Sequence, residues 1–418
     1  MQVDTPPYST GTDPTATSLR QWLAVIAVAI SAFAFVTSEF LPVGLLPAIA
    51  HDLGVSSGVA GLMVTTPGVV AAIFAPALII GAGRLDRRYA FLMLTAALLV
   101  ANLVCALAGD LGVMLVGRAL LGAALGGFWT LATAAAPRLV QPRDTAKATA
   151  IILTGVTCAT VIGVPLGTFI ASFASWRASF AVTAGLVALA LVAQTVLVPS
   201  LPSASASALR IADFRTLLGR SHTRSSMLMV ALVFGAHFST YTYIAPLLEQ
   251  DFSVNGLTLL LFGFGLIGFV SNALMSMVVS NHLKRSSMLM IVLLMGAMAA
   301  MLFLEHSRIG ETAGILLWGI AFGALPLCFS VWIQRAAADL PEVGSALFVS
   351  IIQVAIAVGS AAGGSIVDRA GVRADFVPGL ALALLGLVLL YRLASPQLPQ
   401  AAVVAGAAPV PRECAEAV

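Results

Sequence analysis

Charged side chains are scarce in this sequence. Asp, Glu, Lys and Arg make up 9% of its 418 residues, whereas soluble globular domains carry about 25%. Hydrophobic residues make up 60%. Apolar stretches of about 20 residues recur along the chain, and each is long enough to cross the ~30 Å hydrocarbon layer of a bilayer as an α-helix. This composition excludes a soluble protein and predicts an all-α polytopic membrane protein.

Sequence signals for several other function classes are also missing. The four cysteines, Cys105, Cys158, Cys328 and Cys414, are scattered singly, so they suggest neither a disulfide framework nor a metal-ligand spacing. No P-loop motif for ATP is present. The net charge is only +3, which gives no case for nucleic-acid binding. We find no nucleophile–base set at a membrane face, so we expect no enzyme, no metal and no cofactor.

The apolar stretches predict twelve membrane-spanning helices. The flanking segments 1–20 and 396–418 carry no such stretch and are expected to be disordered tails. The predicted spans cover residues 22–48, 58–82, 89–108, 111–136, 147–172, 178–198, 226–248, 256–280, 287–304, 311–334, 344–366 and 377–395.

The placement of lysine and arginine predicts the orientation of these spans. With the N-terminus inside, sixteen of the 21 basic residues fall on the cytoplasmic side and four fall outside. Arg118 alone lies within a span. An excess of Lys and Arg marks the cytoplasmic side, so both termini are expected to be cytoplasmic.

A hydrophilic connection at 199–225 separates the first six spans from the last six. It predicts two helix bundles, 21–198 and 226–395, joined on the inner side. An apolar stripe within the connection indicates a short amphipathic helix on the inner membrane surface, ended by Gly219, with a plain solvated linker as the alternative. The stripe consists of Leu209, Ile211, Phe214, Leu217 and Leu218.

The two halves share a short sequence pattern. LPAIAHDLGVS (46–56) ends the first span, and APLLEQDFSVN (245–255) ends the seventh. An offset of 199 residues aligns Pro47 with Pro246. We therefore expect two pseudo-symmetric six-helix bundles with a substrate site between them, a layout typical of alternating-access transporters.

Three ionisable residues lie well inside predicted spans: Glu39, Arg118 and His237. A charge at the bilayer centre costs ~2.5–3.5 kcal/mol even on lenient insertion scales, so such residues usually mark a transport path. The 199-residue offset aligns Glu39 with Phe238, next to His237. We expect Glu39 and His237 to face a central cavity and to exchange protons. A purely structural hydrogen bond is the alternative for each.

Several aromatic and amide side chains are candidate contacts for a substrate. Together they could form an amphipathic wall that suits a small polar organic molecule, whereas ordinary packing is the alternative for each one. The candidates are Phe128, Trp129, Tyr241, Trp332 and Gln353.

The fifth span carries glycines on one helical face. Gly155, Gly163 and Gly167 lie eight and four residues apart, with Pro165 among them, and small residues in this rhythm let a neighbouring helix approach closely. Prolines in the first and seventh spans remove backbone donors, which suits helices that bend, although kinking alone is an adequate account. These are Pro42, Pro47 and Pro246.

Over residues 20–395 the chain resembles the major facilitator superfamily, in particular its twelve-span drug:proton antiporter branch. TSEFLPVGLLPAI and HFSTYTYIAPLL look like the bacterial sugar-efflux group, which exports arabinose-type sugars and thiogalactosides. GVPLG (163–167), with Gly155 upstream, is similar to the antiporter motif of span 5. Arg118 in LVGRALLGAALGG matches a span-4 arginine implicated in proton coupling.

GRLDRR (83–88) falls where this family carries a charged loop that latches the cytoplasmic side. The family pattern has an Asp before the first Arg and a Gly four residues earlier, whereas this sequence has Gly83 and Ile79 there. Anchoring by positive charge is the alternative for this loop. The candidate loop residues are Arg84, Asp86, Arg87 and Arg88.

The resemblance implies a proton-coupled antiporter of a bacterial inner membrane. It would export small sugars or sugar-like or drug-like molecules by alternating access, working as a monomer with protons, a small-molecule substrate and the lipid bilayer as partners. A multidrug:proton antiporter and a proton-coupled importer are the alternatives, because both use the same parts. A non-transporting sensor would need a signalling domain, and none is found in this sequence.

Overall fold

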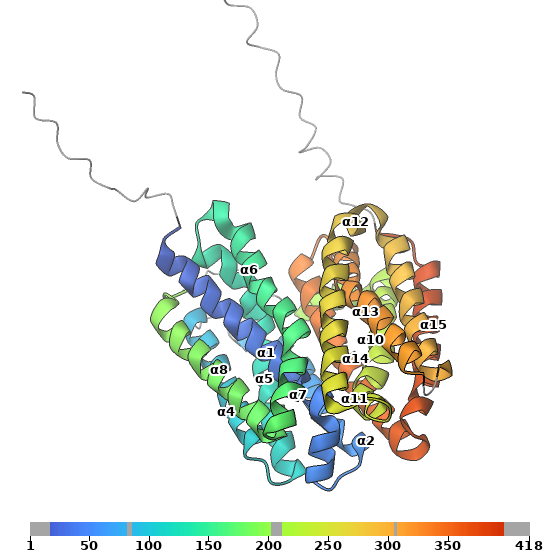
Figure 1. Cartoon of the computed structure of the whole chain (residues 1–418). Coiled ribbons are helices and arrows are strands. Elements are labelled where there is room, and N and C mark those ends of the chain that lie inside the picture. Colours follow the sequence, from blue (N-terminus) through green and yellow to red (C-terminus); the bar gives the residue numbers. More distant parts are fainter. Residues whose placement is uncertain (1–16, 82–85, 202–210, 305–306, 397–418) are drawn as a thin grey trace, which may run out of the picture. The chain divides into compact units, whose positions relative to one another are not determined.

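The structure is a computed structural model that describes residues 17–81, 86–201, 211–304 and 307–396. Within these ranges every regular element is helical (Figure 1), which confirms the predicted all-α class. The chain divides into two compact units. Unit 1 holds the described residues up to Leu201 together with Ile244–Phe262, and unit 2 holds residues 211–243 and the described residues from Gly263 onward.

Unit 1 is built around its first helix. A capping box at Ser18 and Gln21 starts this helix, which then packs against α5, α6, α7 and α8. A 3₁₀ turn, Pro142–Asp144, precedes α6, and a π-helical turn, Ala159–Gly163, joins α6 to α7. The helices of unit 1 are α1 (Leu19–Asp52), α2 (Ser57–Ala60), α3 (Leu62–Gly81), α4 (Arg87–Ala106), α5 (Leu111–Leu139), α6 (Thr145–Cys158), α7 (Val164–Phe173), α8 (Trp176–Leu197) and α11 (Ile244–Leu248).

Unit 2 is arranged around α10, which packs against α13, α14 and α15 (Figure 1). The long α12 begins among the residues of unit 1 and continues in unit 2. The remaining elements are α9 (Ile211–Gly219), α10 (Ser221–Tyr241), α12 (Val254–Phe303), α13 (Arg308–Ala336), α14 (Pro341–Ala370), the 3₁₀ turn η3 (Val372–Asp375) and α15 (Phe376–Arg392).

Helices are present at all twelve predicted span positions. Ten segments among the described residues are long and apolar enough to cross a membrane. One of them, α12, is 50 residues long and has non-helical backbone at His282, so it carries the predicted spans 256–280 and 287–304 in succession. The predicted seventh span corresponds to α10 and α11, which are not among the ten because α10 carries polar residues at both of its ends.

The division into units departs from the predicted boundaries at one place. Residues 244–262, which the sequence assigns to the second half, belong to unit 1 because α11 packs against α1.

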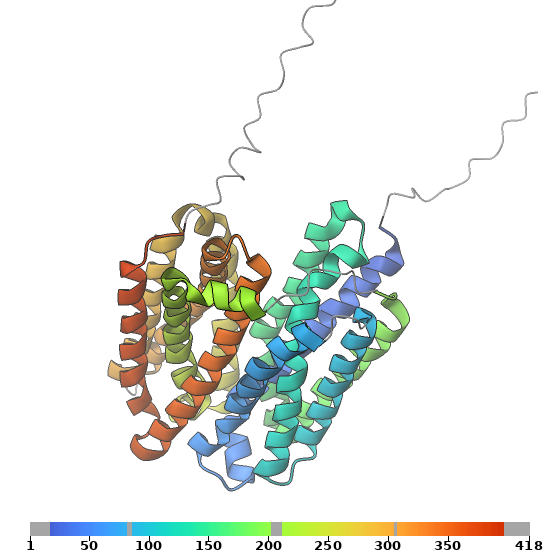
Figure 2. The same cartoon turned by 180° about the vertical axis from the view of Figure 1, so that it is seen from behind.

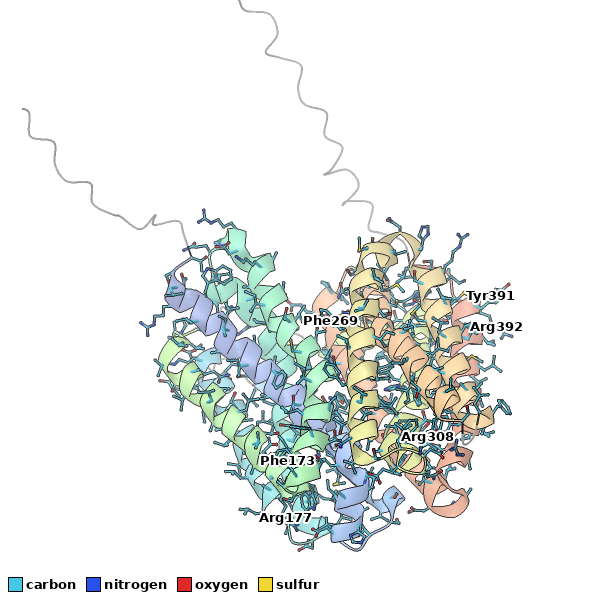
Figure 3. All side chains as sticks on the ribbon, viewed as in Figure 1. Phe173, Arg177, Phe269, Arg308, Tyr391 and Arg392 are labelled. Carbon is cyan, nitrogen blue, oxygen red and sulfur yellow. The ribbon has the colours of Figure 1, made fainter. Side chains whose placement is uncertain are left out.

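Polar contacts hold the C-terminal end of α1. Arg177 donates to the Asp52 carboxylate at 2.5 Å and to the Ala108 carbonyl at 2.9 Å, and Figure 3 shows Arg177 at this end of unit 1.

The glycine face of the fifth span lies against α1. A Cβ atom at Gly155 would meet the backbone of Ala29, and one at Gly163 would lie 2.7 Å from Thr37 Oγ1. The residue numbers of these contacts rise together along both helices, so the two helices run in the same direction, as the first and fifth spans should. Only glycine permits this approach, because an added side chain would overlap α1.

The linker helix is present as α9, but its apolar side packs on protein. Leu217 is fully buried against Ala337 and Val343, and Phe214 packs on the same cluster. Figure 2 shows the light-green α9 running across the ends of its neighbours in unit 2. Leu217 and Phe214 thus have a protein partner in α13 and α14, whereas the place of this helix on the inner membrane surface stays a prediction. Leu209 lies outside the described residues.

Arg220, directly after α9, fixes this arrangement. Its guanidinium donates two hydrogen bonds, at 2.7 and 2.6 Å, to the carboxylate of Asp339 between α13 and α14. These hydrogen bonds hold the pKa of Asp339 below its ordinary value. The linker is therefore tied to unit 2 by a bidentate ion pair as well as by apolar packing.

Candidate functional site

The side chain of Arg118 joins three helices of unit 1. Arg118 lies on α5 and is 1% exposed. Its Nη1 donates to the Ser38 carbonyl at 2.5 Å, and its Nη2 donates to the Glu39 carbonyl at 2.7 Å. Its Nε donates to the Met63 carbonyl of α3 at 2.6 Å. One guanidinium thus connects α1, α3 and α5 at the level of Glu39.

Two of these carbonyls lie four residues before a proline. In an α-helix each carbonyl accepts a hydrogen bond from the N–H four residues later, and proline has no N–H. Ser38 precedes Pro42, and Met63 precedes Pro67, by four positions. Arg118 therefore supplies the donors that the two prolines remove. A buried carbonyl left without a donor costs about 1–3 kcal/mol, so the arginine offsets a penalty built into both helices.

Glu39 lies on the segment of α1 that Arg118 holds. It is 6% exposed, and the opposite charges of Glu39 and Arg118 interact electrostatically. Asn102 of α4 also secures this turn, because its Nδ2 donates to Ser38 Oγ at 2.9 Å. The carboxylate thus sits on backbone that side chains of two neighbouring helices position. A proton gained or lost at Glu39 changes the local charge next to the Arg118 guanidinium.

His237 lies in an aromatic cluster within unit 2. It is 1% exposed on α10, and its ring stacks on Phe322, with the centroids 3.3 Å apart, and on Tyr241, at 4.8 Å. Trp318 Nε1 donates to His237 Nδ1 at 2.9 Å. An indole N–H can only donate, so Nδ1 is an acceptor without a proton. His237 is therefore a neutral imidazole in this structure, held by Trp318 of α13.

The structure brings together some of the other predicted cavity residues and separates others. Tyr241 stacks on His237 as the helical spacing predicts, whereas Phe128 is fully buried in the core of unit 1 against Phe35. Trp332 is fully buried and donates to Ser226 Oγ at 2.9 Å. Two candidates remain: Trp129 is partly buried beside the unit-1 core, and Gln353 is 4% exposed on α14.

The charged loop residues connect helix ends inside unit 1. Asp86 caps α4 by accepting from the Arg88 backbone N–H at 2.9 Å, and it also accepts from Ser200 Oγ. The Ser200 hydrogen bond lowers the pKa of Asp86. Arg88 Nη2 donates to the Thr195 carbonyl at 2.8 Å, and the Arg87 N–H donates to the Leu201 carbonyl at 3.0 Å. Arg84 lies outside the described residues.

Sequence reasoning missed several partners of these residues. Trp318 and Phe322 contact His237, and Asn102 contacts Ser38 beside Glu39, yet each lies more than sixty residues away from its partner along the chain. Only the prolines offered a signal, since a carbonyl four residues before Pro42 or Pro67 needs another donor.

Comparison with known proteins identifies the family. The model of the Major Facilitator Superfamily matches residues 28–359. The chain belongs to the Major Facilitator Superfamily. It is therefore a multi-pass membrane transporter of the secondary, non-enzymatic kind, as the sequence predicts.

Similar proteins match most of the chain's length. OpdE of Pseudomonas aeruginosa, named a transcription regulatory protein, is 35% identical over 386 residues, which cover 90% of this chain and 95% of OpdE. The purine ribonucleoside efflux pump NepI of Escherichia coli is 36% identical over 356 residues, or 84% and 88% of the two chains. The crystal structure of the nucleoside transporter NupG has a TM-score of 0.70 at 16% identity, covering 89% of this chain and 98% of its own.

Proposed function

We propose that this transporter is a proton-coupled exporter of small sugar-containing molecules, with ribonucleosides as the leading substrate class. It would work as a monomer by alternating access in a bacterial inner membrane, with both termini cytoplasmic. The similarity to a protein named as a purine ribonucleoside efflux pump, at 36% identity over 356 residues, supports export and favours nucleosides over free arabinose-type sugars or thiogalactosides.

The observation that carries the proton-coupling part is the contact between Arg118 and α1. The Arg118 guanidinium donates to the carbonyls of Ser38 and of Glu39 itself. The buried acid therefore lies on a turn whose backbone depends on one cation rather than on regular helical hydrogen bonds alone. Protonation of Glu39 changes the charge beside that cation, so it can bias how firmly α1 is held against α5.

The coupling follows from the cost of burying charge. Protonated Glu39 is neutral and tolerable in an apolar bundle, whereas the ionised form needs Arg118 or a polar substrate nearby. Loss of the proton to the cytoplasm would create the form that captures substrate. Reprotonation from outside would release the substrate. The transporter then binds either the proton or the substrate but not both at once, so that a proton gradient drives export.

His237 has a different role in this proposal. Its Nδ1 is occupied by the Trp318 hydrogen bond, so it is suited to a neutral, fixed surface of stacked rings. Tyr241 extends the same stack toward Phe264. A nucleobase is a flat, partly polar ring that could stack on such a cluster in a state that uncovers it, because His237 and Tyr241 are 1% and 8% exposed in this structure.

The test is uptake into liposomes that contain the purified transporter, under an imposed pH gradient. The panel contains a purine nucleoside, a pyrimidine nucleoside, ribose, arabinose, a thiogalactoside and an unrelated apolar cation. The proposal predicts that nucleosides move in the direction opposite to proton flow and that the free sugars move little. Substrate movement in the same direction as protons would identify an importer. Transport of unrelated apolar cations at equal rates would identify a multidrug antiporter.

A further inference from the structure

A second buried acid, Asp375, lies in unit 2 outside the site described above. It ends η3 and directly precedes α15, and it is 1% exposed. Among the described residues, neither of its carboxylate oxygens has a hydrogen-bond partner. Buried polar groups in native proteins are nearly always hydrogen-bonded, so this acid needs a physical explanation.

The surrounding helices explain why no donor reaches Asp375. An Asp at the start of a helix ordinarily accepts from the N–H two or three positions later. Here the third position is Pro378, which has no N–H, and no capping hydrogen bond forms. On the other side α14 presents Gly363, where a Cβ would lie 2.9 Å from Asp375 Oδ2. The carboxyl group is enclosed by backbone and apolar atoms.

The neighbouring titratable groups form hydrogen bonds with other residues. Arg373 donates to Glu311 at 2.8 Å and to the Met301 carbonyl at 2.9 Å. Tyr243 of α10 donates its hydroxyl proton to the Ser360 carbonyl at 2.8 Å. One more titratable group lies nearby: Asp368 on α14 is exposed and carries the same sign of charge as Asp375. The α10 side facing η3 presents the Ser239 backbone, with its carbonyl 2.5 Å from a Cβ built at Gly363.

A cavity of about 260 Å³ leads to Asp375 within unit 2. Helices α10, α14 and α15 form it, and its rim includes Val354 and Val358, whose side chains are exposed. Apart from Asp375 and Ser239, the residues that line this cavity are aliphatic residues, proline and glycine. An ionised carboxylate here would have neither a donor nor a cation to stabilise it, and the favourable field of the α15 N-terminus is weak by comparison.

We propose that Asp375 is a second proton-binding site of this transporter, occupied by a proton in the structure described here. The ligand is the proton itself, held on the carboxyl group at the end of the unit-2 cavity. This site is independent of the coupling role given to Glu39, because the two acids lie in different units of the structure.

The test is infrared difference spectroscopy of the purified full chain between acid and alkaline pH. A buried, protonated carboxylic acid gives a carbonyl-stretch band that ionised carboxylates lack. The proposal predicts that Asp375→Asn removes one such band, whereas the matched change Asp368→Asn at an exposed acid leaves it in place. Glu39→Gln should leave the Asp375 band unchanged, so a failure of the Glu39 account is distinguished from a failure here.

A second measurement covers the folding of the variant. The amide of Asp375→Asn resembles the neutral acid in shape, so its melting temperature should match the parent at acid pH. At alkaline pH it should exceed the parent, because the parent must ionise a buried group. A band that persists in Asp375→Asn would overturn the proposal. A melting-temperature difference that does not shift in favour of the variant as pH rises would also overturn it, because ionisation of Asp375 would then cost no stability.

Discussion

Arg118 donates a hydrogen bond at 2.5 Å to the carbonyl of Ser38, the carbonyl that Pro42 leaves without its helical donor. The relationship explains why an arginine is retained inside the membrane. Its charge is costly there, but its planar fork of donors can meet several carbonyls at once. A lysine or a neutral amide offers fewer donors in less suitable directions.

The pairing predicts a rescue between two positions. Arg118→Gln should abolish transport and lower the melting temperature in detergent, because each uncompensated buried carbonyl costs about 1–3 kcal/mol. Pro42→Ala, added to Arg118→Gln, restores a backbone N–H for the Ser38 carbonyl and should recover part of the stability. The melting temperatures of the parent, both single variants and the double variant measure this coupling. Additive effects of the two changes would show that the arginine and the proline act independently.

The glycine face of the fifth span predicts a steric block. Gly163→Leu should prevent the close approach of α7 to α1, because a Cβ at this position already lies 2.7 Å from Thr37 Oγ1. We expect loss of transport and lower yield of folded protein. Gly185→Leu on α8 is the matched control, since no atom lies within 4 Å of a Cβ there. Equal transport by the two variants would contradict the close-packing account.

The aromatic cluster predicts the protonation state of His237. Its ring should remain neutral, with the proton on Nε2, across the physiological pH range in the parent. Trp318→Phe keeps the apolar volume but removes the donor to Nδ1, so a second tautomer should become populated. Nitrogen NMR shifts of the labelled ring report both states. A ring that is already protonated in the parent at neutral pH would favour His237 as a proton carrier.

The linker contact predicts acid sensitivity. The hydrogen bonds from Arg220 lower the pKa of Asp339, so the pair contributes its full stability above the ordinary Asp value of about 3.9. That contribution is lost as pH falls through the lowered value, when the carboxylate is protonated. Amide exchange of α9, corrected for intrinsic rates, should rise in this acid range. Asp339→Asn should show the raised exchange at neutral pH, and unchanged exchange in that variant would mean that apolar packing alone holds α9.

Local patterns in the sequence were sufficient to predict the helices, and they failed where contacts join distant residues. The spans follow from hydropathy, and the face formed by Gly155, Gly163 and Gly167 follows from spacing. The Trp318 partner of His237 could not be predicted, because 81 residues separate them and many indoles could have served. The packing of α9 on α13 and α14 could not be predicted, because an apolar stripe fits a membrane surface as well as a protein surface.

The two buried acids show the same contrast between local and distant information. Glu39 stands out because its span contains no other charge. Asp375 escaped notice because it lies in a predicted outer loop, close to Arg369 and Arg373, where an acid looks unremarkable. Its burial results from η3 folding back between α14 and α15. Only the folded arrangement reveals that Arg373 turns to Glu311 instead.

Proton release on substrate addition tests the central claim most directly. Purified transporter in weakly buffered detergent solution is mixed with a transported nucleoside, and a pH indicator follows the protons released. The account predicts release by the parent and by Glu342→Gln, a change at an exposed glutamate on α14, and no release by Glu39→Gln. If Glu39→Gln releases as many protons as the parent, Glu39 is not the proton carrier.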